Sequence, residues 1–208
     1  MGAEAQVCPQ CGWTFDVVAL QSNTCRKCRS AYLVTSVAYL EKFDKPAIQK
    51  YIARYSEVLK TAPDDRDALL AMGICYLRLD LYELASQFLT KLIAVHPAEA
   101  AGYYYKSISG LKGRRPRTVT LTTIREIEQL LLTAMALEPQ NARHDLLLAA
   151  VRHDYYALNG LRVPQPTPDQ LLKDADGKHI DRREIRQGLT LAKIGPSPVD
   201  SVIGSLDS

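Results

Sequence analysis

Polar and apolar residues along most of this chain follow the spacing of amphipathic helices rather than the alternation of strands. Three of these helical stretches end alike, at Pro63, Pro97 and Pro139, and proline ends a helix because it has no amide hydrogen to donate. The first interval is 34 residues and the second is 42, which fits the same unit with an insertion of eight. Such a period predicts repeated pairs of helices in the middle of the chain.

The stretch 66–99 carries this pattern most clearly. Gly73 and Ala85 are small enough to let two antiparallel helices approach closely. The large residues that would fill the space between these helices are Leu69, Tyr76, Leu89 and Leu92. With Tyr82 and Pro97 at further motif positions, the stretch resembles a tetratricopeptide repeat (TPR). The resemblance implies a solenoid of antiparallel helix pairs that binds proteins or peptides, and it brings no particular catalytic activity.

Weaker copies of the repeat flank this stretch. Residues 100–141 form the next copy, with an insertion at 112–120 between its two helices, and 141–158 begins a third. Upstream, 44–61 has the pattern of a second helix whose partner is degenerate. The resemblance therefore covers roughly 45–158.

Two Cys-x-x-Cys pairs near the start, Cys8 with Cys11 and Cys25 with Cys28, provide four thiolates at a spacing typical of a structural Zn²⁺ site. Two disulfides would need an oxidising compartment, and the first residues have no signal-peptide pattern. A thioredoxin-like motif would need one pair in a βαβ setting, which neither pair has. We therefore expect one structural zinc ion bound by these four cysteines.

This arrangement resembles a zinc ribbon. The strand that leaves the first cysteine pair is expected within 12–20, and its partner within 30–35. A module of this size has too small a core to stay folded without its metal.

Three parts are expected from these patterns. A zinc ribbon occupies 1–36, TPR-like helical repeats occupy 37–163, and a C-terminal segment occupies 164–208. In this segment Asp181 is expected to cap a short helix, and 194–208, rich in Gly, Pro and Ser, to form a flexible tail. The fold class is mainly α, with a small N-terminal β ribbon.

Composition limits the function classes. The chain is 47% hydrophobic and 24% charged, as globular proteins are, and its net charge of +3 does not by itself demand nucleic acid. No apolar run approaches the length of a membrane span. No P-loop, dinucleotide glycine pattern or recognisable nucleophile occurs. We therefore expect neither an enzyme, nor a small-molecule substrate, nor a membrane partner, and the expected compartment is the cytoplasm.

By position in the repeat family, the inner helices would line a groove for a partner. The groove residues would be Leu70, Ile74, Leu77, Arg78, Tyr104, Ile108, Leu111, Arg143 and Leu146. Because most of them are apolar, an amphipathic helix or an apolar peptide fits better than a C-terminal carboxylate. The alternative is that the chain's own C-terminal part covers this surface, since a short solenoid needs capping.

The insertion carries a basic loop, Lys112, Arg114, Arg115 and Arg117, with no acidic residue between them. Such a run is either a solvated loop or a contact for an acidic partner or a phosphate backbone. The leading hypothesis is an adaptor that binds protein or peptide partners. The alternatives are a nucleic-acid-associated factor that uses the ribbon and loop 112–117, and a redox or metal-sensing regulator with labile thiols.

Overall fold

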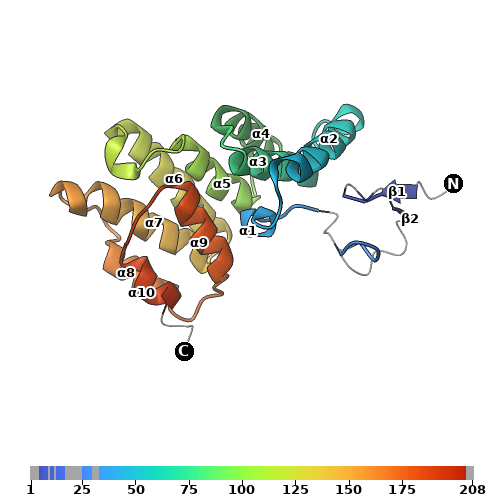
Figure 1. Ribbon diagram of the computed structural model, residues 1–208. Coiled ribbons are helices and arrows are strands. Elements are labelled where there is room, and N and C mark those ends of the chain that lie inside the picture. The colour runs from blue at the N-terminus through green and yellow to red at the C-terminus, as the bar shows by residue number, and fades with distance from the viewer. Residues whose placement is uncertain (1–4, 9, 12, 17–24, 30–32, 205–208) are drawn as a thin grey trace.

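The computed structural model describes residues 5–8, 10–11, 13–16, 25–29 and 33–204, and the helices dominate it (Figure 1). The strands are β1 (Ala5–Val7) and β2 (Thr14–Asp16). The helices are α1 (Val37–Leu40), α2 (Lys45–Thr61), α3 (Arg66–Arg78), α4 (Tyr82–Val95), α5 (Ala100–Gly110), α6 (Leu121–Leu137), α7 (Ala142–Tyr155), α8 (Pro168–Ala175), α9 (Arg182–Leu191) and α10 (Val199–Gly204), with 3-10 turns η2 (Pro116–Thr118) and η3 (Ala157–Asn159).

The strand after the first cysteine pair has a different partner from the expected one. β2 lies inside the predicted 12–20 segment, but it pairs antiparallel with β1, so that Val7 lies opposite Thr14. Of the predicted partner 30–35, residues 30–32 lie outside the described residues and 33–35 form no strand. The reason is local: the tight turn at the first cysteine pair joins the segments on its two sides into a hairpin.

The best repeat forms the predicted antiparallel pair, α3 and α4. A Cβ atom on Gly73 would lie 2.6 Å from the Leu89 side chain, so only glycine permits this approach. Ala85, Leu89 and Leu92 are buried in the contact. Asp65 caps α3 by accepting a hydrogen bond from the Ala68 amide, and α4 ends at Val95 before the stop proline.

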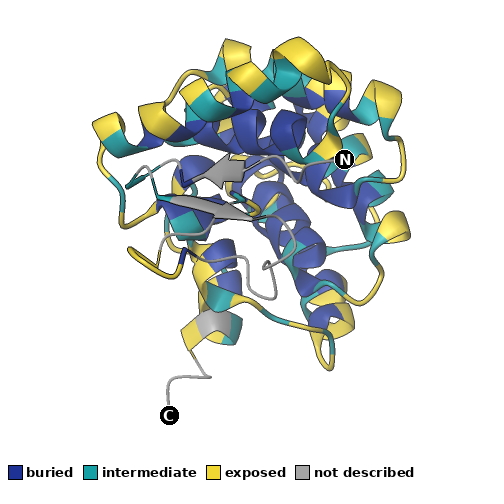
Figure 2. Cartoon of the chain, turned by 90° about the vertical axis from the view of Figure 1, so that its right-hand side faces the viewer, coloured by how far each residue is buried: buried dark blue, intermediate teal, exposed yellow. Residues whose placement is uncertain are grey.

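The helices follow one another from right to left in Figure 1, from α2 to α7, and helices that are neighbours along the chain pack side by side. α5 packs against α4 and α6, and α7 packs against α6. The predicted insertion folds as the turn η2 and joins α5 to α6. Figure 2 shows the result: buried residues gather where the helices face one another, and exposed residues lie on their outer sides.

The C-terminal segment returns across the inner side of the helix array. α8 and α9 pack against α7, and α9 also packs against α1 (Figure 1). Leu171, Ile185 and Val199 belong to the same hydrophobic core as the helices α2 to α7. The expected flexible tail from 194 to 208 is therefore corrected over its first part, because α10 forms and Val199 is fully buried; residues 205–208 lie outside the described residues.

Candidate metal centre and neighbouring surfaces

Two tight turns bring the four predicted cysteine ligands together. In the first turn the Cys8 amide donates to the Trp13 carbonyl over 2.8 Å, which closes the β1–β2 hairpin around the pair. In the second turn the Arg29 amide donates to the Cys25 carbonyl, also over 2.8 Å. Arg29 adopts a positive φ of 58° there, which ends the turn. Each Cys-x-x-Cys pair is thus folded so that both of its thiols point to one place.

The sulfur positions fit a tetrahedral metal ion. The Sγ atoms of Cys8 and Cys28 lie 3.7 Å apart, as do those of Cys11 and Cys25. All four sulfurs lie within 4.8 Å of one another, and none of these cysteines is in a disulfide. Metal–sulfur bonds of about 2.3 Å at tetrahedral angles separate the sulfurs by about 3.8 Å. The cluster can therefore hold one metal ion with four thiolate ligands.

The thiols differ in how readily they ionise. Burial raises the pKa of Cys8 to about 12, although the amides of Cys11 and Gln10 oppose this. Burial also acts against ionisation of Cys25, but the backbone amides of Cys28 and Lys27 outweigh it and lower its pKa to about 6. Because a metal ion takes up thiolates, its binding to this cluster releases protons and weakens in acid.

The centre touches the helical array through the first turn. The Gln10 side-chain amide donates to the Ala47 carbonyl of α2 over 2.9 Å, and Lys50 Nζ lies 3.5 Å from the Gln10 carbonyl oxygen. The second turn is exposed over 26–29, including the thiol-bearing Cys28. One side of the cluster therefore rests on α2, and the other side faces solvent.

The predicted groove is closed in this structure. Seven of its apolar and aromatic residues are at most 8% exposed: Leu70, Ile74, Leu77, Tyr104, Ile108, Leu111 and Leu146. Arg78 and Arg143 are half-buried. The cover is the chain itself, because α1 packs on α3 and α9 packs on α1 and α7. The alternative weighed from the sequence, self-capping by the C-terminal part, agrees with this packing, and the open groove does not.

A buried carboxylate fixes this cover. Glu184 of α9 is 2% exposed. It accepts hydrogen bonds from the Tyr105 hydroxyl over 2.5 Å and from the Ala38 amide over 3.0 Å. One side chain thus joins α9, α5 and α1. Sequence reasoning missed Glu184. In the structure it lies four residues before Gly188, which abuts Tyr104, and therefore on the inward face of α9.

Part of the basic loop is bound to acidic residues of the chain itself. Arg115 donates two hydrogen bonds to the buried Asp154 carboxylate, and the Arg117 amide donates a third over 3.0 Å. Lys112 forms an exposed ion pair with Glu83. Arg114 and the Arg117 side chain are exposed. The loop is therefore a folded connection between α5, α6 and α7, rather than a solvated basic loop.

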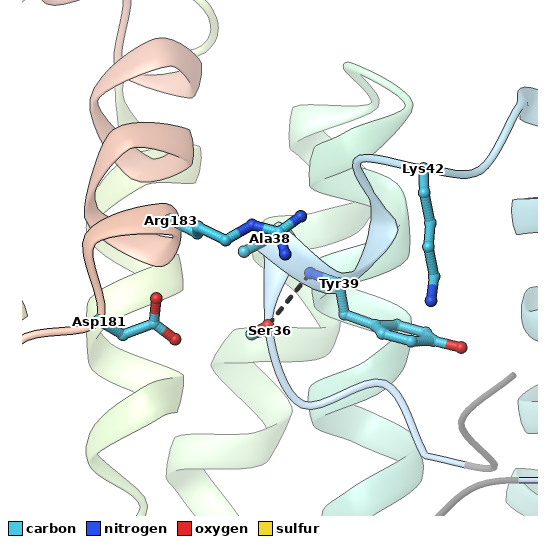
Figure 3. Close-up of a pocket in the computed structure, with 6 residues that line it drawn as sticks. All are labelled: Ser36, Ala38, Tyr39, Lys42, Asp181 and Arg183. Atoms are coloured by element: carbon cyan, nitrogen blue, oxygen red, sulfur yellow. Dashed lines mark hydrogen bonds between the residues drawn. The ribbon is translucent and has the colours of Figure 1, made fainter. Parts of the chain in front are cut away.

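A small pocket of about 220 Å³ opens between α1 and the start of α9 (Figure 3). Its lining residues are Ser36, Ala38, Tyr39, Lys42, Asp181 and Arg183. The Tyr39 amide donates to Ser36 Oγ, and the Asp181 carboxylate accepts from the Glu184 amide as the predicted cap of α9. Lys42 lies over the Tyr39 ring at 4.6 Å. Several of the polar groups here already stabilise the helix ends.

Comparison with models of known protein families and with curated proteins finds no match for this chain. Across the described residues, the helices are too short or too polar to cross a lipid bilayer.

Proposed function

We propose that this chain is a non-enzymatic adaptor: a structural zinc ribbon attached to a TPR-like helical scaffold that holds protein or peptide partners. The observation that carries the proposal is the closed four-thiol centre. Four protein ligands complete the coordination of the metal, so the centre supplies rigidity rather than an open position for a reacting water.

Zinc is the metal that this donor set favours. Four thiolates in a tetrahedron suit Zn²⁺, which has no redox chemistry and takes structural Cys₄ sites. Iron can also be bound by four cysteines. The hairpin β1–β2 around the first pair supports a ribbon-like module, although the strand expected after the second pair does not form in the described residues.

The buried charges of the helical part support a scaffold. Arg152 Nε lies 2.6 Å from Glu128 Oε1, and Lys178 Nζ lies 2.8 Å from Asp145 Oδ1. The first pair joins α6 to α7, and the second joins α7 to the connection between α8 and α9. Such groups are held by partners inside the fold, which favours a role in positioning helices over a role in proton transfer.

Partner binding is assigned to surfaces other than the inner groove. The inner surface is covered by α1 and α9, so a partner would reach the exposed side of the zinc module or the outer helices. On the outer side, Leu81 and Leu84 at the start of α4 are 44% and 37% exposed. An adaptor with a filled groove resembles a capped solenoid that presents its ends and its convex side.

Metal analysis and affinity capture test the proposal together. Purified protein is expected to contain about one zinc per chain, and Cys28→Ser to lose it along with captured partners. Cys75→Ser is the matched control, because Cys75 is buried in α3 away from the cluster and should keep both. Two disulfides in a mass spectrum would contradict the zinc assignment, and capture that survives zinc loss would contradict a partner role for the module.

The alternative function, a nucleic-acid-associated factor acting through loop 112–117, has less support. Arg115 and Lys112 are bound to acidic residues of the chain, which leaves two exposed side chains, Arg114 and Arg117. The cations beside the zinc module provide a stronger candidate surface.

A further inference from the structure

The net charge of this protein is concentrated at one end of the chain. Residues 1–54 contain seven Lys and Arg against four Asp and Glu, a net charge of +3. Subtraction from the totals of 26 basic and 23 acidic residues leaves nineteen of each in 55–208, a net charge of zero. Residues 1–54 therefore carry the whole excess. Within them, the cysteine module and α2 lie at the end of the molecule away from α7 and α8 (Figure 1). A charge gathered in this way directs anionic partners to that end.

The second cysteine turn presents its cations outward. Arg26, Lys27 and Arg29 are all exposed. The backbone amide of Lys27 points inward to the Cys25 sulfur, so the turn holds the metal ligands with its backbone and leaves the charged side chains free to face solvent. No acidic residue occurs between Val17 and Leu40. The three cations thus form a compact basic knuckle, defined here as Arg26, Lys27 and Arg29.

The first cysteine turn adds a cation from α2. Lys50 is exposed and lies against the Gln10 carbonyl, which places it beside the cluster from the other side. Arg54 follows one turn later on the same helix. The basic knuckle and Lys50 therefore lie beside the same four-cysteine cluster.

These cations differ from three cations of the helical part that are bound to buried acids of the fold. Arg115, Arg152 and Lys178 each bind a buried carboxylate inside the fold. By contrast, the basic knuckle and Lys50 form no ion pair with any carboxylate whose side chain the structure describes. Their charge is available to a ligand.

We propose that the basic knuckle, with Lys50, is a nucleic-acid-binding surface that contacts the phosphate backbone. Two of the three knuckle residues are arginines, whose planar guanidinium groups bind phosphate oxygens in pairs. A nucleic acid offers one fixed charge per nucleotide, so three closely spaced cations engage neighbouring phosphates together and release their counterions. Binding of this kind fixes position and carries no sequence preference by itself. The proposal goes beyond the adaptor function, to which it adds a nucleic acid as a second class of partner.

A competing role for the knuckle is to offset the charge of the metal centre. One Zn²⁺ with four thiolates carries two net negative charges, and nearby cations stabilise it. This role predicts that neutralising the knuckle weakens metal binding, whereas a phosphate-binding role predicts that metal binding persists. The metal content of the knuckle variant therefore distinguishes the two roles.

The test uses the full zinc-loaded chain and labelled 30-nucleotide probes: single-stranded DNA, single-stranded RNA and a DNA duplex. Fluorescence anisotropy at about 50 to 200 mM salt gives Kd and its salt dependence. The unmodified protein is expected to bind, with a slope of log affinity on log salt of about −3. The triple variant Arg26→Gln, Lys27→Gln and Arg29→Gln is expected to bind at least tenfold more weakly at about 50 mM salt, with the slope flattened by about two to three.

The matched control removes the same charge at the neutral end: Arg125→Gln, Arg162→Gln and Lys173→Gln, all exposed. It is expected to change affinity by less than threefold. Any of these results would overturn the proposal: no binding by the unmodified protein at about 50 mM salt, equal loss in the two triple variants, or loss of zinc in the knuckle variant without any loss of probe binding.

Polyglutamate of matched length identifies the class of ligand. Binding of polyglutamate as tight as that of the oligonucleotides would overturn the assignment to nucleic acid and point to an acidic protein segment. These results are independent of the adaptor function, because partner capture by the knuckle variant is measured separately. Loss of oligonucleotide binding with capture intact concerns the knuckle alone, and loss of capture with oligonucleotide binding intact concerns the adaptor alone.

Discussion

At the scale of the residue, two glycines in the helices show how much a single Cβ atom matters. A Cβ on Gly73 would come within 2.6 Å of Leu89 Cγ, whereas a Cβ on Gly110 would lie 3.5 Å from Ile127, an ordinary contact. Glycine is less favourable than alanine inside a helix by roughly 0.5–1 kcal/mol. The sign of a Gly→Ala substitution therefore depends on the space at each site.

We expect Gly73→Ala to lower the free energy of unfolding by about 1–3 kcal/mol, because α3 and α4 must separate or Leu89 must leave its rotamer. Gly110→Ala, the matched control, should be neutral or stabilising. Urea denaturation followed by circular dichroism measures both. Equal effects would mean that α3 and α4 approach each other less closely than the 2.6 Å distance at Gly73 implies.

Residues of this kind are the part of the fold that the sequence predicts well. The pair Gly73 and Leu89 follows from motif spacing, and so do the four cysteines, because their spacing in the chain is short and fixed by the ligand geometry. Glu184 does not follow from any such spacing. Its partners Tyr105 and Ala38 are distant in sequence, and one chain alone gives no signal of that contact.

At the scale of the element, a buried carboxylate determines how the insertion folds. Asp154 of α7 is 1% exposed and binds the Arg115 side chain and the Arg117 amide. The sequence predicts the insertion, but it predicts that the arginines there face solvent or bind an external ligand. A run of like charge contains no sign of the acid that binds it from another helix.

We expect Asp154→Ala to destabilise the protein by about 3 kcal/mol, because it leaves a partly buried guanidinium and a backbone amide without their acceptor. Arg114→Ser, at an exposed position of the same loop, should change stability by less than about 0.5 kcal/mol. Thermal and urea unfolding of the two variants decide the matter. A small effect of Asp154→Ala would show that the loop folds without this anchor.

The turn between α6 and α7 makes stability depend on pH. Glu138 has its pKa lowered to about 2, chiefly by the hydrogen bond from His144 and also by Arg143. Burial lowers the pKa of His144, so this histidine is neutral in the folded protein; its Nε2 lies 3.2 Å from the Glu138 carboxylate and its Nδ1 is buried without a partner. In both cases the unfolded chain binds more protons than the folded one, so stability falls as pH decreases.

The free energy of unfolding is therefore expected to decrease in two steps as the pH falls. The first step lies below about pH 6.5, where the His144 imidazole takes up a proton more readily in the unfolded chain than in the folded one. The second lies between about pH 4.5 and 2, where the Glu138 carboxylate is protonated. His144→Gln should remove the first decrease and weaken the second, because the hydrogen bond from His144 is the largest cause of the lowered Glu138 pKa. His179→Gln is the control, since His179 is exposed. Denaturation at a series of pH values measures this, and an unchanged upper decrease in His144→Gln would rule out His144 as its source.

At the scale of the whole molecule, the C-terminal segment completes the fold. The repeat pattern identifies helix pairs, but it does not say what covers their inner side, because the segment after 164 has no repeat spacing of its own. Its apolar residues Leu171, Ile185 and Leu189 are buried. The helical array is thus covered by its own chain, and residues that an open solenoid would offer to a ligand are core residues here.

The replacement of Tyr104 and Ile108 by Asp distinguishes a core from a groove. Both side chains are at most 1% exposed and lie under α9. Because buried charges without partners are strongly unfavourable, the double variant should unfold or melt far below the unmodified protein. The exposed Thr190→Asp on α9 is the control and should leave the melting temperature nearly unchanged. A folded double variant with normal melting would mean that this surface is open in solution.

Deletion of 165–208 tests the same cover without adding charge. The truncated chain loses α8, α9 and α10, together with the Glu184 contacts that join α1 to α5, so the inner faces of α5 and α7 become exposed to water. Apolar surface of that extent promotes association, and we expect dye binding by exposed hydrophobic groups and aggregates on size exclusion. Cys28→Ser, which perturbs the opposite end, should lose metal yet stay monodisperse, because the helical core does not include the cysteine cluster. A monomeric, cooperatively unfolding truncated chain would show that the repeats are stable alone and that the C-terminal segment is a removable occupant of a groove.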